Sequence, residues 1–365
     1  MLRVVYLNCH QVPSGWNHHE VLARWPTLLE VPLALGRAGL QVDVVQAAPR
    51  ADVMVREGVT FHFTPGGPKT LADAVARCRP DVVHHQSFRF PVHARLLHRR
   101  LPQVPLLVQD HGGRAPRSWR RFVAAWGARH IAGAAFTVRE QARAYVRRGV
   151  LREGVPVFEV LESSSRFTPG EQASAQDVTG LAGDPCFLWV GRLNANKDPL
   201  TVLTALERAH PQLPDPHLWM CYTDASLLGA TQEWLRARPE LATRVHLIGT
   251  VNHERIELLC RAADFLVLGS HAEGSGYAVL EALACGTTPL VTDIPSFRRL
   301  TGGGEVGALS PPGDAETMAR AMVDWSGRDR ARLRQRARAH FERALSFSVV
   351  AADLRAAYER LVVQR

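Results

Sequence analysis

The sequence lacks any run of roughly 18 apolar residues, so it predicts no transmembrane helix. Its first residues, MLRVVYLNCH, have neither the long apolar core nor the small-residue cleavage site of a signal peptide, and they predict a β-strand instead. The six cysteines contain no Cys-x-x-Cys pair and share no regular spacing with histidine. We therefore expect buried, reduced thiols in a cytosolic protein.

Nucleic-acid-binding motifs are also absent, although the formal net charge is +9 and the pI is about 9.8. The sequence has no zinc-finger spacing and no aromatic strand of the kind that stacks on RNA bases, so we expect no nucleic-acid partner. An acidic ligand, such as a sugar nucleotide or a phospholipid head group, accounts for part of the positive charge.

What the sequence contains is an alternation of short apolar runs and amphipathic stretches, which is typical of an α/β protein. The strands expected in the first half are Val4–Leu7, Val42–Gln46, Val59–Phe63, Asp81–His84, Leu106–Gln109, Ala135–Val138 and Val157–Leu161. Those expected in the second half are Cys186–Val190, Leu218–Tyr222, Val245–Ile248, Phe265–Leu268 and Pro289–Thr292.

A change of composition in the middle of the chain predicts two domains, which also suits a length of 365 residues. Residues 169–185 are rich in Gly, Ser, Ala and Pro, so we assign them to a linker that has room for a short surface helix. The domains are then 1–168 and 186–340, followed by a C-terminal helix, 341–365, that would pack back on the first domain. Ligands of such parallel sheets bind beyond the carboxyl ends of the strands.

The segment FLWVGRLNANKDPL places two cations on a strand-to-helix loop. An apolar run ends at Gly191, and Asp198 is suited to cap the helix that follows. Arg192 and Lys197 would lie near the N-terminus of that helix, where cations and backbone N–H groups form an anion site that suits a diphosphate. The alternative is that both are solvated surface charges.

The segment SHAEGSGYAVLEALACG contains a second group of polar residues. The backbone amides of Gly274, Ser275 and Gly276 would be open to ligand oxygens at the start of a helix. Glu273 and Glu281 flank them, about 12 Å apart if the whole stretch were helical, and they could hold the two ends of an extended ligand. The alternative is that Glu273 is an ordinary surface residue and Glu281 an ordinary residue of an amphipathic helix. The apolar neighbours of Glu281 make this alternative less favourable.

Gly191-Arg192-Leu193 with Lys197, followed by Glu273-x7-Glu281, resembles the two signature segments of family 4 glycosyltransferases of the GT-B fold. The C-terminal half matches specifically, whereas the N-terminal half matches in layout. The resemblance implies an α/β protein of the GT-B fold, with two Rossmann-like domains facing each other across a cleft. The N-terminal domain would be the acceptor side, and the C-terminal domain would bind the nucleotide sugar.

The resemblance also implies roles for individual residues. Arg192 and Lys197 would neutralise the donor diphosphate as it leaves, Glu281 would bond the ribose hydroxyls, and Glu273 would face the transferred sugar. The other donor-binding residues that it implies are Gly191, Gly249, Val251, Gly274, Ser275, Gly276 and, in the first domain, Gly15. His111 (or Asp110) would present a polar group to the sugar, with ordinary turn chemistry in Asp-His-Gly-Gly as the alternative.

The implied activity is that of a retaining hexosyltransferase, which moves a sugar from a nucleoside-diphosphate sugar to an unknown acceptor: a glycan, a lipid-linked group or a small molecule. Catalysis would be electrostatic, without a protein nucleophile, a cofactor or a metal. The sequence accordingly has no clear Asp-x-Asp or His-Glu-x-x-His signature. The alternatives are a non-catalytic or weakly active nucleotide-sugar-binding protein and a sugar-nucleotide epimerase or phosphorylase.

Three departures from the family pattern leave the donor, the acceptor and the level of activity open. The stretch HQVPSGWNHHE has only Gly15 where a Gly-Gly pair is usual. The tetrapeptide ESSS at 162–165 replaces the usual Asn-Gly-x-Asp, and Ser275 stands where a large apolar residue is common.

An aromatic and basic stretch between Arg114 and Arg148 has two interpretations. At helical spacing, one face carries Trp119, Phe122, Val123 and Trp126, and the other carries Arg117, Arg120 and Arg121. We expect the aromatic face to lie in the core. The alternative is peripheral contact with an anionic membrane at its cytoplasmic face, which would give access to a lipid-linked acceptor.

Overall fold

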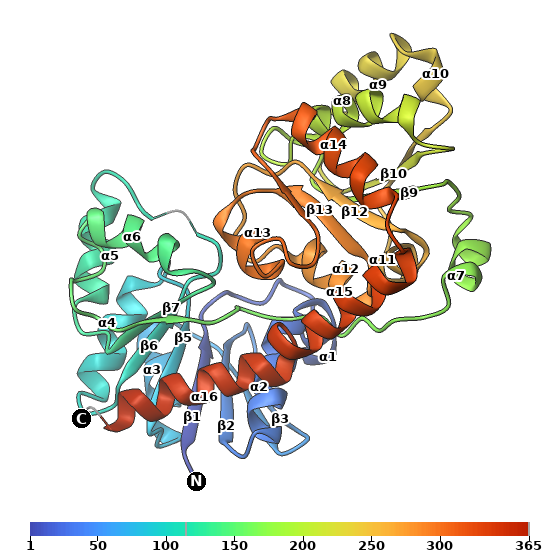
Figure 1. The fold of residues 1–365 in the computed structure, drawn as a ribbon. Coiled ribbons are helices and arrows are strands. Elements are labelled where there is room, and N and C mark those ends of the chain that lie inside the picture. Colours follow the sequence, from blue (N-terminus) through green and yellow to red (C-terminus); the bar gives the residue numbers. More distant parts are fainter. Residues whose placement is uncertain (114, 364–365) are drawn as a thin grey trace. The chain divides into compact units, whose positions relative to one another are not determined.

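The computed structural model describes residues 1–113 and 115–363, which form two compact α/β units (Figure 1). The N-terminal unit contains residues 1–164 and the C-terminal helix α16 (Phe347–Val363). The C-terminal unit contains residues 165–346. Gln364 and Arg365, which the predicted helix 341–365 includes, lie outside the described residues.

The N-terminal unit is built on an eight-stranded sheet with the order β3-β4-β2-β1-β5-β6-β7-β8. All neighbours are parallel except β3 and β4, which form an antiparallel hairpin. The strands are β1 (Arg3–Asn8), β2 (Gln41–Ala47), β3 (Asp52–Arg56), β4 (Val59–Thr64), β5 (Val82–Gln86), β6 (Leu106–Gln109), β7 (Gly133–Phe136) and β8 (Val157–Glu159). The sequence did not predict β3, because this edge strand has no buried residue and therefore no alternation of apolar and polar positions.

Local sequence signals explain where the helices of this unit begin. The helices are α1 (His18–Arg24), α2 (Pro26–Arg37), α3 (Pro68–Arg77), α4 (Pro91–Arg100), α5 (Arg120–Ala128), α6 (Arg139–Arg147) and α16. Proline occupies the first position of α2, α3 and α4, where its missing N–H is not needed. Asn17 and Glu20 form a capping box at α1. Helix α16 packs against α2, and its Tyr358 hydroxyl lies 2.7 Å from Nδ1 of His84 on β5.

The prediction that the aromatic face of α5 lies in the core was wrong. The exposed fractions are 67% for Trp119, 63% for Phe122 and 44% for Trp126. The buried face of α5 instead consists of small residues, and a Cβ atom on Gly127 would lie 2.3 Å from Cβ of Pro91 on α4. The two helices approach so closely at Gly127 that the large aromatic side chains lie on the outer face.

The C-terminal unit has a six-stranded, fully parallel sheet with the order β11-β10-β9-β12-β13-β14. Its strands are β9 (Cys186–Gly191), β10 (His217–Tyr222), β11 (Val245–Gly249), β12 (Phe265–Leu268), β13 (Thr288–Thr292) and β14 (Ala308–Ser310). Every residue of β12 and β13 is buried, so both faces of the sheet are covered there.

Helices flank each of these strands. They are α7 (Gln172–Thr179), α8 (Pro199–Ala209), α9 (Leu228–Arg236), α10 (Pro239–Ala242), α11 (His253–Ala262), α12 (Tyr277–Cys285), α13 (Pro295–Leu300), α14 (Ala315–Ser326) and α15 (Arg330–Ala344). The predicted linker, 169–185, contains α7, which packs on α11 and belongs to the C-terminal unit. The side-chain amides of Gln172 and Gln176 both donate to the carbonyl of Ala262, which holds α7 in place.

Candidate functional site

The loop between β9 and α8 has a fixed shape that positions Lys197. Asp198 adopts a left-handed backbone (φ +42) and caps α8, because its Oδ1 accepts a hydrogen bond from the N–H of Thr201 at 3.2 Å. Its Oδ2 accepts from the Thr201 hydroxyl at 2.7 Å and lies 3.0 Å from Nε2 of His271. A non-glycine residue in this conformation carries strain that its surroundings must maintain, as functional loops often do.

The loop between β12 and α12 is bound directly to this first loop. The Asn196 amide donates to the carbonyl of Ala272 at 2.9 Å, and the N–H of His271 donates to the carbonyl of Asn196 at 2.8 Å. At Gly269, a Cβ atom would lie 2.7 Å from the backbone oxygen of Asp198. The two segments that the sequence singled out therefore form one assembly at the carboxyl ends of the adjacent strands β9 and β12.

An ion pair joins the two predicted groups of charged residues. Nζ of Lys197 lies 2.5 Å from Oε1 of Glu273, and the two side chains are only 14% and 13% exposed. Lys197 is therefore turned into the site, where its charge is compensated by Glu273. Arg192 lies on the same loop but is exposed. Hydrogen bonds from the N–H of Ser226 and from the Asn194 amide lower the pKa of Asp224, and the charge of Arg192 adds to this shift.

Glu281 lies on the buried side of α12 and contacts a residue that the sequence did not single out. Its Oε1 lies 2.6 Å from Nε2 of His253, and this hydrogen bond raises the pKa of His253 above its usual value. The ring of Phe167 lies 4.7 Å from the ring of His253. The cap at Asn252 was a usable sequence signal, because it fixes His253 in the first turn of α11, just beyond Gly249.

The N-terminus of α12 depends on a glycine. Gly276 has a left-handed backbone (φ +64), and a Cβ atom there would lie 2.8 Å from Cδ1 of Leu300 and 3.0 Å from Cε1 of Phe297. Ser275 beside it is buried. The N-terminal backbone amides of the nine-residue helix α12 therefore come immediately after the loop that carries Glu273.

The other predicted site residues, Gly15 and His111, belong to the N-terminal unit. Gly15 lies in an exposed turn between β1 and α1, with a left-handed φ of +92. His111 has neighbours at both ring nitrogens: Nε2 contacts Oε1 of Gln86, and Nδ1 lies 3.1 Å from Oε2 of Glu162. Glu162, the first residue of the ESSS departure, therefore has a structural partner in this unit.

Asp110, next to His111, is a buried carboxyl group with an altered pKa. It is 5% exposed, and its Oδ1 accepts a hydrogen bond from the Tyr145 hydroxyl at 2.7 Å. Burial raises the pKa of Asp110 to about 6, although the bond from Tyr145 opposes the shift. The stabilisation from protonated Asp110 is therefore complete below its usual pKa of 3.8 and is lost as the pH rises through 6.

Asp110→Asn is expected to stabilise the protein at about pH 8, by up to about 3 kcal/mol, and to match the wild type at about pH 4. The amide keeps an oxygen for Tyr145 but carries no charge that burial can penalise. Urea unfolding at the two pH values measures this difference. Glu153→Gln, at an exposed site of the same unit, is the control and should change little. Equal stability of Asp110→Asn and wild type at the higher pH would contradict the argument.

Among residues 1–113 and 115–363, one group could offer three ligands to a metal ion. Asp43, His62 and Cys78 have ligand-type atoms within 4.8 Å of one another, and all three are partly buried. Nε2 of His62 already lies 2.8 Å from Oδ1 of Asp43, so a hydrogen bond explains their proximity. The group lies on β2, β4 and the end of α3, and it includes none of the predicted site residues.

Known proteins are similar in sequence to this chain. Residues 172–340 match the family model for "Glycosyl transferases group 1". A phosphatidyl-myo-inositol mannosyltransferase of Mycobacterium leprae is 32% identical over 197 residues, which are 51% of this chain and 50% of the relative. The chain spans about half the length of the curated relatives that it matches.

Two solved structures share the whole fold. Sucrose-phosphate synthase of Thermosynechococcus elongatus covers 100% of both chains, with a TM-score of 0.73 and 18% identity. Anabaena Alr3699/HepE in complex with UDP and glucose covers 99% of this chain and 100% of its own, with a TM-score of 0.70 and 15% identity. The fold prediction is confirmed: the chain has the GT-B fold with two Rossmann-like domains. The group 1 match covers the domain that carries Lys197, Glu273 and Glu281.

The described part of the chain contains no helix that is both long enough and apolar enough to cross a membrane.

Proposed function

We propose that this chain is a retaining glycosyltransferase of family 4 that transfers a hexose from a nucleoside-diphosphate sugar. The C-terminal unit binds the donor, and the N-terminal unit binds the acceptor. The match of residues 172–340 to the group 1 glycosyl transferases supports the reaction class, and the UDP and glucose bound to the Anabaena protein support the donor class.

The observation that carries the proposal is the position of Lys197. Its side chain is mostly buried, and its ammonium group is paired with Glu273 on the adjacent loop. Lys197 directly precedes Asp198, the residue that caps α8. A cation that has lost much of its water interacts strongly with charge that develops nearby. As the sugar–phosphate bond breaks, Lys197 and Arg192 stabilise the leaving diphosphate, while Glu273 faces the sugar.

The same arrangement lets the reaction proceed without a metal or a cofactor, because two protein cations neutralise the diphosphate. His111, oriented by Gln86 and Glu162, presents its ring to the sugar from the N-terminal unit. The donor completes its contacts with backbone groups at Gly15, Gly191, Gly249 and Val251.

Release of nucleoside diphosphate tests the proposal directly. Thermal shifts with UDP, GDP, ADP and their sugars first identify the donor, because a ligand stabilises the state that binds it. The protein should then release the diphosphate from that sugar nucleotide, in the presence of EDTA as well as in its absence. NMR of the product should show the anomeric configuration of the donor. The proposal fails if no sugar nucleotide binds and none is turned over.

Glu281→Ala is expected to weaken binding of the nucleoside diphosphate by about tenfold, since a charged hydrogen-bond acceptor for the ribose is lost. Calorimetric titration measures the effect. His253→Ala removes the neighbour of Glu281 and should weaken binding less, because the carboxylate remains. Nucleotides that lack both the 2′- and the 3′-hydroxyl separate the roles: Glu281→Ala should bind them no worse than the wild type does. Unchanged binding of the ribonucleotide by Glu281→Ala would contradict the assignment.

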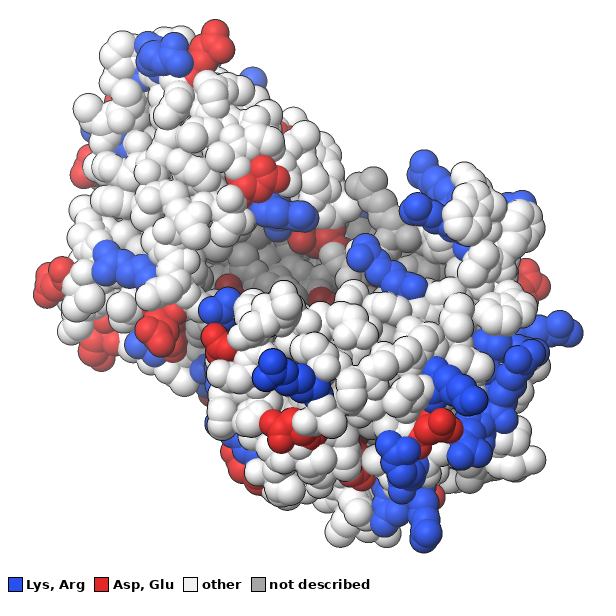
Figure 2. Space-filling model, turned by 180° about the vertical axis from the view of Figure 1, so that it is seen from behind, with Lys and Arg blue, Asp and Glu red and all other residues white. Residues whose placement is uncertain are grey.

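The exposed face of α5 supports peripheral contact with an anionic membrane at its cytoplasmic side. Trp119, Phe122 and Trp126 are exposed next to Arg120 and Arg121. Figure 2 shows Lys and Arg gathered over the part of the N-terminal unit that carries α4 to α6. Aromatic side chains at the level of the lipid head groups, with arginines on anionic lipids, hold a protein at the surface without a spanning helix.

A further inference from the structure

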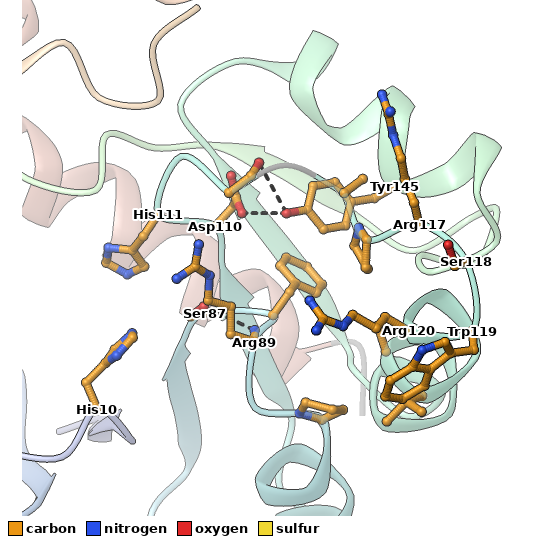
Figure 3. Close-up of a pocket in the computed structure, with 17 residues that line it drawn as sticks. His10, Ser87, Arg89, Asp110, His111, Arg117, Ser118, Trp119, Arg120 and Tyr145 are labelled. Atoms are coloured by element: carbon orange, nitrogen blue, oxygen red, sulfur yellow. Dashed lines mark hydrogen bonds between the residues drawn. The ribbon is translucent and has the colours of Figure 1, made fainter. Parts of the chain in front are cut away.

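A pocket of about 1210 Å³ lies entirely within the N-terminal unit (Figure 3). His10 follows β1, Ser87 follows β5 and Asp110 follows β6, so the pocket lies at the carboxyl ends of three adjacent parallel strands. Residues of α5 and the segment before it form the opposite wall, which includes Trp119 and Arg120. Ligands of parallel sheets bind at this end of the strands.

The pocket has a large excess of positive charge. Arg89, Arg117 and Arg120 line it, whereas Asp110 is its one carboxylate among the described lining residues. Figure 3 shows the guanidinium group of Arg120 pointing from α5 toward the middle of the pocket, whereas Arg117 turns away.

Arg89 and Arg120 have no carboxylate partner in residues 1–113 and 115–363. Arg120 lies 5.9 Å from the ring of Trp119, and the guanidinium group of Arg89 has no hydrogen bond or ion pair in this part of the chain. Burial lowers the pKa of His10, and the nearby His111 and Arg89 lower it further. Positive groups that face one pocket without compensation favour an anionic ligand.

The backbone fixes the position of Arg89. Ser87 is buried and has a φ of +98, a left-handed conformation that a residue with a side chain rarely adopts. Its N–H donates to the carbonyl of Gln109 at 2.9 Å, and its hydroxyl oxygen accepts from the N–H of Arg89 at 3.1 Å. Such strain persists where the surroundings hold it, and it is common at binding sites.

We propose that this pocket binds the phosphate ester of the acceptor, with Arg89 and Arg120 as its phosphate ligands. Guanidinium groups bind phosphate oxygens through paired N–H donors. The apolar wall at Phe88, Trp119 and Val123 gives the rest of the acceptor a surface against which to pack. The proposal deepens the proposed function, because it names the acceptor class of that transfer. The ester belongs either to a soluble sugar phosphate or to a phospholipid head group.

Calorimetric titration of the full chain with glucose 6-phosphate and with glucose tests the soluble source. Sedimentation with phosphatidylcholine vesicles, with and without about 20 mol % phosphatidylinositol, tests the lipid source. We expect one of the two phosphate esters to bind, and Arg89→Ala and Arg120→Ala each to weaken that binding by about tenfold or more. Arg129→Ala removes the same charge from the exposed end of α5 and should bind as the wild type does.

Two results would overturn the proposal. One is that neither ester binds; the other is that the ester binds equally well to Arg89→Ala, Arg120→Ala and Arg129→Ala. Arg89→Gln, with circular dichroism, shows whether a loss at Arg89 reflects binding or folding. Nucleoside diphosphate binding, measured on the same variants, should be unchanged. A variant that no longer binds the ester but still binds the nucleotide has lost the function of this pocket only. If the wild type itself binds no nucleotide, the proposed function is refuted.

Discussion

Lys197→Ala is expected to reduce the rate of nucleoside diphosphate release by about 10²–10³-fold, which is the usual cost of removing one preorganised electrostatic group. The fall should be in kcat, because the leaving diphosphate carries more charge in the transition state than in the bound donor. The chain contains only two lysines, so Lys69→Ala, at an exposed position of the N-terminal unit, is the matched control. Steady-state release of the diphosphate measures both variants.

The same substitution leaves Glu273 mostly buried and without its lysine, which should cost about 3 kcal/mol of stability. The double variant Lys197→Ala/Glu273→Gln removes both charges, so it should recover much of the lost stability. It should not recover turnover, since both the cation at Lys197 and the carboxylate at Glu273 are lost. If the double variant regains activity together with stability, Lys197 acts only through folding, and its catalytic role is refuted.

Much of the fold could be predicted from the sequence, because buried parallel strands are short apolar runs. The expected strand Phe265–Leu268 has the bounds of β12, and the expected strand at 289–292 differs from β13 by one residue. Elements without an apolar pattern were missed, as β3 was, or were expected only as an option, as the short surface helix in the predicted linker was. The edge strand β3 has no buried side chain, and α7 buries only Ala175, so neither has the periodicity by which such elements are recognised.

For the candidate site, the sequence predicted individual residues from their neighbours along the chain, but not the contacts between segments that are distant in sequence. Lys197 and Glu273 were each expected, but the 2.5 Å contact between them depends on the packing of two loops 76 residues apart. Gln86 was missed for the same reason, since it meets His111 through tertiary structure. His253 had a local signal in the cap at Asn252, but its contact with Glu281 also depends on tertiary structure. The face of α5 was misassigned because sequence spacing identifies an aromatic face but not the direction in which it points.

Gly269→Ala is expected to lower both stability and turnover, because the new methyl group would lie 2.7 Å from the backbone oxygen of Asp198. Real Cβ atoms do not approach an oxygen so closely, so the loop that carries Lys197 must shift. Overpacking of this kind costs about 1–3 kcal/mol, and the Tm should fall by several degrees. A small displacement of a catalytic group reduces turnover by about 10–100-fold.

The control for this substitution is another glycine of the same unit. Gly229 lies in the first turn of α9, is exposed, and has no atom within 4 Å of the position a Cβ atom would take. Gly229→Ala should therefore leave turnover unchanged and the Tm unchanged or slightly higher, because alanine restricts the unfolded chain. Thermal unfolding and diphosphate release distinguish the two variants. If the two loops form one catalytic assembly, Gly269→Ala should reduce turnover even at temperatures where the protein remains folded. A purely structural contact would lower the Tm alone.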